Sequence, residues 1–232
     1  MDSDVVRKAF ELLCDLQNEL TKALASLAGK QSRGFQDNFN VYSAGHINRA
    51  AEGFIFLTKA SRIDASKFLI RPAIEAMFRL EAVRKQPDLL FRIAYTERIE
   101  DQKWIRRAAV RAQVSYDTAA EERRWSKAKK DYARQCPGHR LEEKELRVRD
   151  AAKAIGKTME DYYDSHYLMY CKYTHAALRA LGGSLNELAD FEDARTMALS
   201  VFSALDILAT IGGAAPNLES LRERMDELDA AP

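Results

Sequence analysis

Apolar residues recur at three- and four-residue steps along most of the chain, which is the spacing of amphipathic α-helices. The clearest run occupies residues 4–27, where leucines line one face and Gly29 follows as a helix stop. The same period continues through residues 40–60, 65–85, 88–112, 158–181 and 193–212. No alternation of strand period has a useful length, and no internal repeat is present. The pattern therefore predicts an all-α fold in which residues 1–232 form a single helical bundle.

Two segments depart from this bundle pattern. Between residues 113 and 157 the charge density rises and large apolar residues become rare, which predicts a charged helical hairpin projecting from the body. Residues 217–232 form a C-terminal amphipathic tail. This tail and the leucine stripe of residues 4–27 each have enough apolar surface either to pair with a second copy or to pack within one chain. A homodimer is therefore one expectation, and the sequence leaves the choice open.

The net charge of +1 conceals an uneven distribution of charge along the chain. Residues 98–149 contain 15 Lys and Arg against 9 Asp and Glu, whereas residues 185–232 contain 3 against 10. Clustered cations gain affinity for nucleic acid by displacing counterions from phosphates, so RNA is a candidate partner. The charges in "EERRWSKAKKDYARQ" alternate in sign, however, which favours a solvated helix with internal pairs. No feature points specifically to DNA.

The sequence predicts a cytoplasmic protein. The stretch "MDSDVVRKAF" lacks the features of a leader peptide, and no uncharged apolar run approaches 18 residues, so no membrane segment is expected. The three cysteines, Cys14, Cys136 and Cys171, are widely spaced and odd in number, which is typical of reduced thiols.

Arg71 and Glu75 are the first candidates for a functional site. They are four residues apart on one helical face, in a stripe whose other positions, Phe68 and Phe78, are apolar. Ions in such a position need a partner, because burying an unpaired charge is costly. Either the pair is an internal salt bridge that fixes helix register, or it belongs to a polar site inside the bundle. Pro72 beside Arg71 is expected to open or kink the helix near Phe68.

The second group of candidates comes from "YYDSHYLMYCKYTHAAL", residues 162–178, which contains two of the four histidines. A projection at 100° per residue places Asp164, Cys171 and His175 on one border of the helix, next to an apolar face that includes Tyr167. His166 lies on the opposite side from His175, so the two histidines do not share a metal ion. No Glu-x-x-His pair occurs in the chain, and no metal or cofactor is expected.

Both stretches together resemble a bacterial all-helical family catalogued as a domain of unknown function. Members of that family have an R-x-x-x-E helix and, far downstream, Y-D-x-x-Y-x-x-x-S-x-x-x-H. The matching residues here are Arg71, Glu75, Tyr163, Asp164, Tyr167 and His175. Cys171 stands where the family usually has serine, and Pro72 where a small residue is common. The resemblance covers roughly residues 41–181 and implies no established activity.

That family is in turn similar to HEPN proteins, helical bundles that include toxins and RNA-cleaving domains. HEPN ribonucleases use an R-x4-6-H motif, and the chain contains one literal match, "RQCPGH", from Arg134 to His139. Pro137 and Gly138 are expected to break the helix that such a motif needs to aim both side chains. The region of His175 has Lys172 upstream but no arginine at the distance that the motif requires, which weakens the prediction of a ribonuclease.

Two functions follow from these residues, and the sequence leaves open whether the protein is an enzyme. In the first, Arg71, Glu75, Tyr167 and His175 form a polar cluster that is structural or lines a small-ligand pocket, with Asp164 and Cys171 nearby. In the alternative, the chain is a HEPN-like metal-independent ribonuclease or a toxin or phage-defence component. His175 would then act as general acid or base, and Arg71 would stabilise the phosphate charge.

Overall fold

The computed structural model describes residues 3–28, 34–174 and 187–229, and these residues form helices and loops without a strand. The helices are α1 (Ser3–Leu27), α2 (Phe35–Lys59), α3 (Ile63–Lys67), α4 (Ile70–Lys85), α5 (Leu89–Ala112), α6 (Thr118–Gln135), α7 (Val148–Ile155), α8 (Lys157–Tyr162), the π-helix η1 (Tyr163–Tyr167), α9 (Leu168–Thr174), α11 (Glu187–Thr210) and α12 (Leu218–Asp229). The all-α prediction is confirmed.

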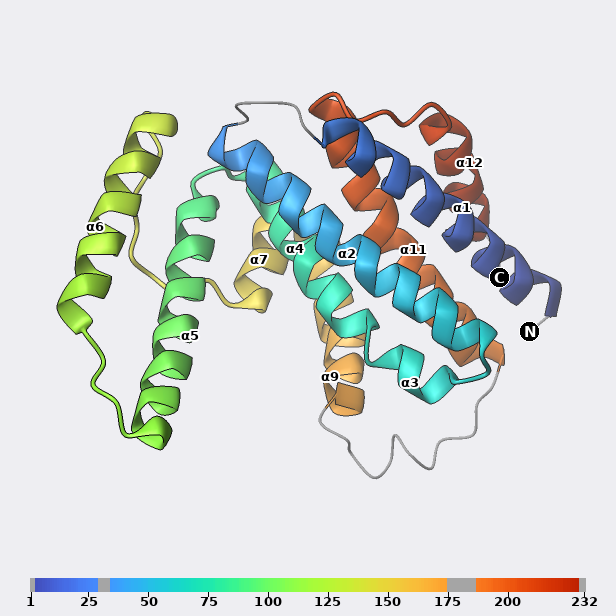
Figure 1. Cartoon of the computed structure of the whole chain (residues 1–232). Helices are drawn as coiled ribbons and strands as arrows, with labels where there is room; N and C mark the ends of the chain where they lie inside the picture. The colour runs from blue at the N-terminus through green and yellow to red at the C-terminus, as the bar shows by residue number, and fades with distance from the viewer. Residues whose placement is uncertain (1–2, 29–33, 175–186, 230–232) are drawn as a thin grey trace.

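The centre of the bundle is built on α1, α2, α4 and α11, which pack side by side (Figure 1). Most of the leucine stripe of α1 is fully buried, and α1 packs along α11. The fully buried members are Leu12, Leu13, Leu16, Leu20 and Leu27, whereas Leu24 is partly buried. Burying one such side chain stabilises the fold by roughly 2 kcal/mol, so this seam is a major source of the bundle's stability.

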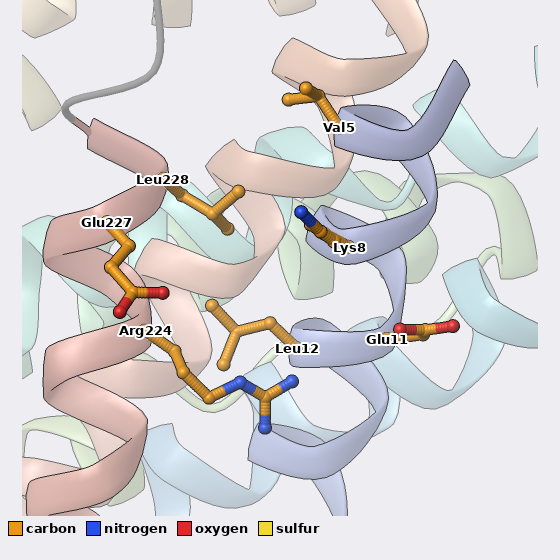
Figure 2. A pocket seen from close by; sticks show the side chains of 7 residues that line it. All are labelled: Val5, Lys8, Glu11, Leu12, Arg224, Glu227 and Leu228. Carbon is orange, nitrogen blue, oxygen red and sulfur yellow. The ribbon is translucent and has the colours of Figure 1, made fainter. Parts of the chain in front are cut away.

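The C-terminal tail packs within the chain. Leu221, Met225 and Leu228 of α12 are buried, and α12 lies against α1 and α11. A cleft of about 390 Å³ lies between α1 and α12. Leu12 of α1 and Leu228 of α12 extend toward each other across it (Figure 2). The two surfaces that the sequence offers for pairing with a second copy, the α1 stripe and the tail, are thus covered in cis.

The projecting arm is formed by α5 and α6 (Figure 1). It differs from the helical hairpin expected over residues 113–157, because its first helix, α5, ends at Ala112 and only its second helix, α6, lies in that range. An ion pair joins the two helices, with Arg98 Nε 2.7 Å from Glu121 Oε1, and the Arg98 guanidinium lies over the Trp125 ring. Residues 136–147 return without regular secondary structure. Their backbone is fastened to α5, because Leu146 N–H donates to Thr96 Oγ1 at 2.7 Å.

The chain leaves the arm through α7, whose apolar side packs on α4. Gly156 then separates α7 from α8 with φ at +141°, a backbone conformation that side chains with a Cβ rarely adopt. This turn starts the continuous helical segment α8, η1 and α9, which contains most of the second motif. Residues 158–174 of the expected helix are helical, and residues 175–181 lie outside the described residues.

Candidate functional site

Arg71 and Glu75 lie in the first two turns of α4. The helix expected over residues 65–85 is broken at Phe68 and Leu69, so α4 begins at Ile70 and Pro72 occupies its first turn, where no backbone donor is needed. One turn apart, Arg71 Nε donates to Glu75 Oε1 at 2.8 Å. The proline therefore sets the start of the helix that aligns this ion pair.

Tyr167 completes the cluster from the distant π-helix η1. Its hydroxyl donates to Glu75 Oε1 at 2.6 Å, and the Arg71 guanidinium carbon lies 6.0 Å from the centre of its ring. The ring also stacks on Tyr163, with centroids 4.8 Å apart. The structure thus brings together three of the residues that the sequence proposes, Arg71, Glu75 and Tyr167, although the first and last are far apart in the chain.

The electrostatics of the cluster keep both donors protonated. Burial raises the pKa of the Tyr167 hydroxyl, and its hydrogen bonds with Glu75 and Cys171 raise it further. Burial opposes the charge of Arg71, but the hydrogen bond and the charge of Glu75 outweigh it and raise the pKa of the guanidinium. Cys171, half-buried one turn after Tyr167, belongs to the same cluster.

Asp164 lies apart from this cluster. Its carboxylate is exposed and faces Arg149 Nη2 at 3.2 Å. The π-helix accounts for the difference, because Leu168 N–H bonds the Tyr163 carbonyl five residues back, and the wider turn invalidates a projection at 100° per residue. His175, the remaining candidate, lies outside the described residues.

Glu75 also lines a cavity of about 180 Å³ between α2, α4 and α5. His46, Arg79 and Glu97 contribute further polar groups to its wall, and Arg79 Nη1 lies 3.7 Å from Glu97 Oε1. Burial raises the pKa of Glu97, against the opposing charge of Arg79, and Asp101 repels it in the same direction as burial. The Glu75 carboxylate thus forms part of an open, mixed-charge surface.

These three wall residues are absent from the candidates drawn from the sequence. Arg79 carries a usable signal, since it continues the stripe of Arg71 and Glu75 by one more helical turn. His46 and Glu97 carry none, because only the packing of α2 and α5 on α4 brings them to Glu75.

A second polar cluster, also unforeseen, lies nearby. Lys67 of α3 and Asp193 of α11 are almost fully buried, with Lys67 Nζ 3.3 Å from Asp193 Oδ2. The Tyr170 hydroxyl donates to Asp193 Oδ1 at 2.7 Å. Burial raises the pKa of Tyr170, and the Asp193 charge adds to the effect. This cluster therefore joins α3, α9 and α11.

Arg134 and His139, the ends of the literal R-x4-6-H match, do not come together as a ribonuclease site of the HEPN type requires. α6 ends at Gln135, before Pro137, and Gly138 has φ at +87°. Arg134 points to Asp131 at 3.1 Å, whereas His139 Nδ1 lies 3.2 Å from the Tyr132 hydroxyl. The two side chains are thus engaged separately.

No group of three or more His, Cys, Asp or Glu side chains that could hold a metal ion occurs within the described ranges. In the same part of the chain, no helix is both long enough and apolar enough to cross a membrane.

The fold and the site define a helical-bundle protein with a tyrosine-capped Arg–Glu pair at a cavity. Comparison with known proteins places it more narrowly: a model of the family of unknown function DUF5677 matches residues 41–193. The chain belongs to this family. The matched range includes α4, η1 and α9, so it contains both motif-bearing helices. No curated protein and no solved structure matches.

Proposed function

We propose that the protein binds a small polar ligand in the cavity that Glu75 lines, with Glu75 as the anchoring group. The observation that supports this proposal most is the double role of Glu75. Its Oε1 accepts hydrogen bonds from Arg71 and Tyr167, at 2.8 and 2.6 Å, while the same residue forms part of the cavity wall. These two hydrogen bonds orient the carboxylate before a ligand arrives, which lowers the entropic cost of binding.

The chemistry of the wall indicates what the ligand carries. Among the described residues, no side chain donates to Glu75 Oε2, so that oxygen is available to a hydroxyl or amine donor. Arg79 offers cationic donors to a ligand oxygen, and its distance of 3.7 Å from Glu97 is too long for a direct hydrogen bond. The ligand is therefore a small molecule with both donor and acceptor groups. The volume of about 180 Å³ limits it to the size of a fragment, or to one end of a larger molecule.

A ligand-observed NMR screen with fragments of up to about ten non-hydrogen atoms tests the proposal. The blocking variant is Ala76→Leu, because Ala76 lines the cavity without joining the polar cluster, and the anchoring variant is Glu75→Gln. Fragments that bind the wild type should lose at least about tenfold in affinity in both variants.

The matched control is Ala119→Leu, the same substitution at an exposed position of α6. It should bind every fragment as the wild type does. Unchanged binding by Ala76→Leu, or equal losses in Ala76→Leu and Ala119→Leu, would contradict a ligand site at Glu75.

A HEPN-like ribonuclease, toxin or defence activity remains the alternative proposal, supported by the resemblance and by the chemistry of Arg71. Its test is the cleavage of an RNA pool by the wild type and by His175→Ala. Cleavage lost in His175→Ala, with stability within about 1 kcal/mol of the wild type, would favour the ribonuclease over a binding function. No cleavage by the wild type would exclude the ribonuclease.

We further infer a cytoplasmic location for this binding function. Cys14, Cys136 and Cys171 are all free in the structure, which supports a reducing compartment. A homodimer stays a prediction, and any dimer interface would have to use a surface other than the α1 stripe and the tail. Sedimentation velocity on the purified chain tests it directly.

A further inference from the structure

A second cavity, of about 370 Å³, lies between the α8–η1 segment, α11 and α12. It shares no lining residue with the Glu75 cavity, and its volume falls within the range usual for small-molecule sites. The π-helix η1 contributes Ser165 and His166 to its wall. Single π-turns are frequent at functional sites, so the wall of this cavity contains a feature typical of such sites.

The His166 ring is held in one orientation. It stacks on Tyr162 with centroids 4.5 Å apart and an angle of 12° between the ring planes. The Tyr162 hydroxyl is itself fixed, because it donates to Thr196 Oγ1 of α11 at 2.9 Å. The two imidazole nitrogens therefore point in defined directions.

Ser165 sets which of those nitrogens carries the proton. Its Oγ donates to the Asp161 carbonyl at 2.7 Å, and it lies 2.8 Å from His166 Nδ1. Because the serine proton is used on the carbonyl, the serine oxygen accepts from Nδ1–H. In the neutral imidazole the other nitrogen, Nε2, is then an acceptor.

That acceptor faces a second one. His166 Nε2 lies 3.7 Å from Glu192 Oε2, and Arg195 Nη1 lies 3.6 Å from the same oxygen. Both distances are too long for a direct hydrogen bond. A donor with two N–H groups, placed about 2.8 Å from each acceptor, would bond both at once. The geometry at Glu192 is thus that of a site for an amine.

The wall offers a carboxylate to an ammonium group and an apolar surface to the rest of the ligand. Glu192 supplies that carboxylate, with Arg195 Nη1 3.6 Å away, whereas Asp161, also in the wall, is already paired with Lys157 Nζ at 2.7 Å. The remaining surface includes Met159 and Met225, whose flexible side chains adapt to an apolar guest. We propose that this cavity binds a small primary amine with an apolar body, its ammonium between His166 Nε2 and Glu192 Oε2 and its body against the two methionines.

The test uses three probes of one shape: benzylamine, benzyl alcohol and benzoate. Each is titrated into the full chain, and the imidazole C–H signals of His166 are followed by NMR, after assignment from their loss in His166→Asn. Benzylamine should bind at least about tenfold more tightly than benzyl alcohol, because its hydrogen bonds are charge-assisted. Benzoate should bind most weakly. Equal binding of the three probes, or no shift of the His166 signals with benzylamine, would overturn the proposal.

A pair of substitutions separates the amine site from general attraction of cations. Glu192→Gln should lower the affinity for benzylamine about tenfold while leaving benzyl alcohol within about twofold. Glu219→Gln removes the same charge from an exposed position of α12 and should change neither affinity. If both variants weaken benzylamine equally, the attraction is long-range and the site at His166 is refuted. The Glu75 cavity is unaffected by either outcome.

Discussion

Two polar clusters in this bundle each consist of one cationic side chain, one carboxylate and one tyrosine. In one, Arg71 and Tyr167 donate to Glu75; in the other, Lys67 pairs with Asp193, and Tyr170 donates to it. Lys67 precedes Arg71 by four residues, and Tyr170 follows Tyr167 by three, so the cations and the tyrosines come from neighbouring turns. The cations lie on the consecutive helices α3 and α4 and the tyrosines on the consecutive elements η1 and α9, whereas the carboxylates lie on α4 and α11, which are far apart in the chain.

The clusters differ in their access to solvent. The side chains of Lys67 and Asp193 are each 5% exposed, whereas those of Arg71 and Glu75 are 26% and 25% exposed, and Glu75 lines a cavity. A sealed cluster has no route for a ligand and serves to join helices. The same chemistry at a cavity leaves one carboxylate face for binding. Exposure, and not the type of residue, thus separates the structural cluster from the candidate site.

The largest effect is expected from removing the sealed carboxylate. Asp193→Ala leaves the Lys67 charge buried without its carboxylate and should lower the free energy of unfolding by about 3 to 5 kcal/mol, as measured by urea denaturation. The double variant Asp193→Ala with Lys67→Met removes that charge and should recover part of the loss. A single-variant loss below about 1 kcal/mol would show that the cluster is hydrated.

The matching change in the open cluster should cost less. Glu75→Ala should lower the free energy of unfolding by about 1 to 2 kcal/mol, since water can reach Arg71 once its partner is gone. The same urea titration measures it. A loss as large as that of Asp193→Ala would mean that the Glu75 cluster is mainly structural, and the comparison between the clusters would fail.

Alkaline pH tests the burial of the sealed cluster through Tyr170. The pKa of Tyr170 is raised in the folded chain, so the unfolded chain loses that proton first as the pH passes the ordinary tyrosine value near 10. The contribution of the Tyr170 hydroxyl to the free energy of unfolding is therefore fully present below pH 10 and decreases as the pH rises above it. Between pH 9 and pH 11 the wild type should lose roughly 1 kcal/mol more than Tyr170→Phe in urea denaturation. Equal losses would show that the hydroxyl titrates normally.

The smallest effect is expected at Asp164. Asp164→Asn removes an exposed pair with Arg149 and should change the free energy of unfolding by less than about 0.5 kcal/mol, by the same urea titration. It should leave fragment binding at Glu75 unchanged. Weaker fragment binding in this variant would return Asp164 to the site and contradict its placement on the surface.

Local periodicity predicts much of the fold. Most leucines of the α1 stripe are buried as their spacing indicates, and the segments predicted as bundle helices are helical wherever they are described, apart from the break at Phe68 and Leu69. The helical hairpin predicted over residues 113–157 is only partly helical, because residues 136–147 have no regular secondary structure. Pro72 predicts the break before α4. The packing of α6 against α5 is harder to predict, because it depends on the Arg98 ion pair and on aromatic contacts, which leave no periodic signal in the sequence.

In the candidate site, too, residues related by helical spacing can be predicted from the sequence, whereas residues brought together by tertiary packing cannot. Arg71 and Glu75 are accessible to sequence reasoning because four residues make one helical turn. Asp164 was misplaced by a projection that assumes 3.6 residues per turn, which the π-helix does not have. Asp193 could not be joined to Lys67 from the sequence, since only tertiary packing of α11 against α3 and α9 brings their charges together.

The central claim is that Glu75 belongs to an open ligand site while Asp193 belongs to a sealed cluster. A crystallographic fragment screen on the wild-type chain tests it most directly. We predict ordered fragments within hydrogen-bond distance of Glu75 Oε2 or Arg79, and none in contact with Asp193. A screen that yields fragments elsewhere on the molecule but leaves the Glu75 cavity empty, or that places one against Asp193, would contradict the account.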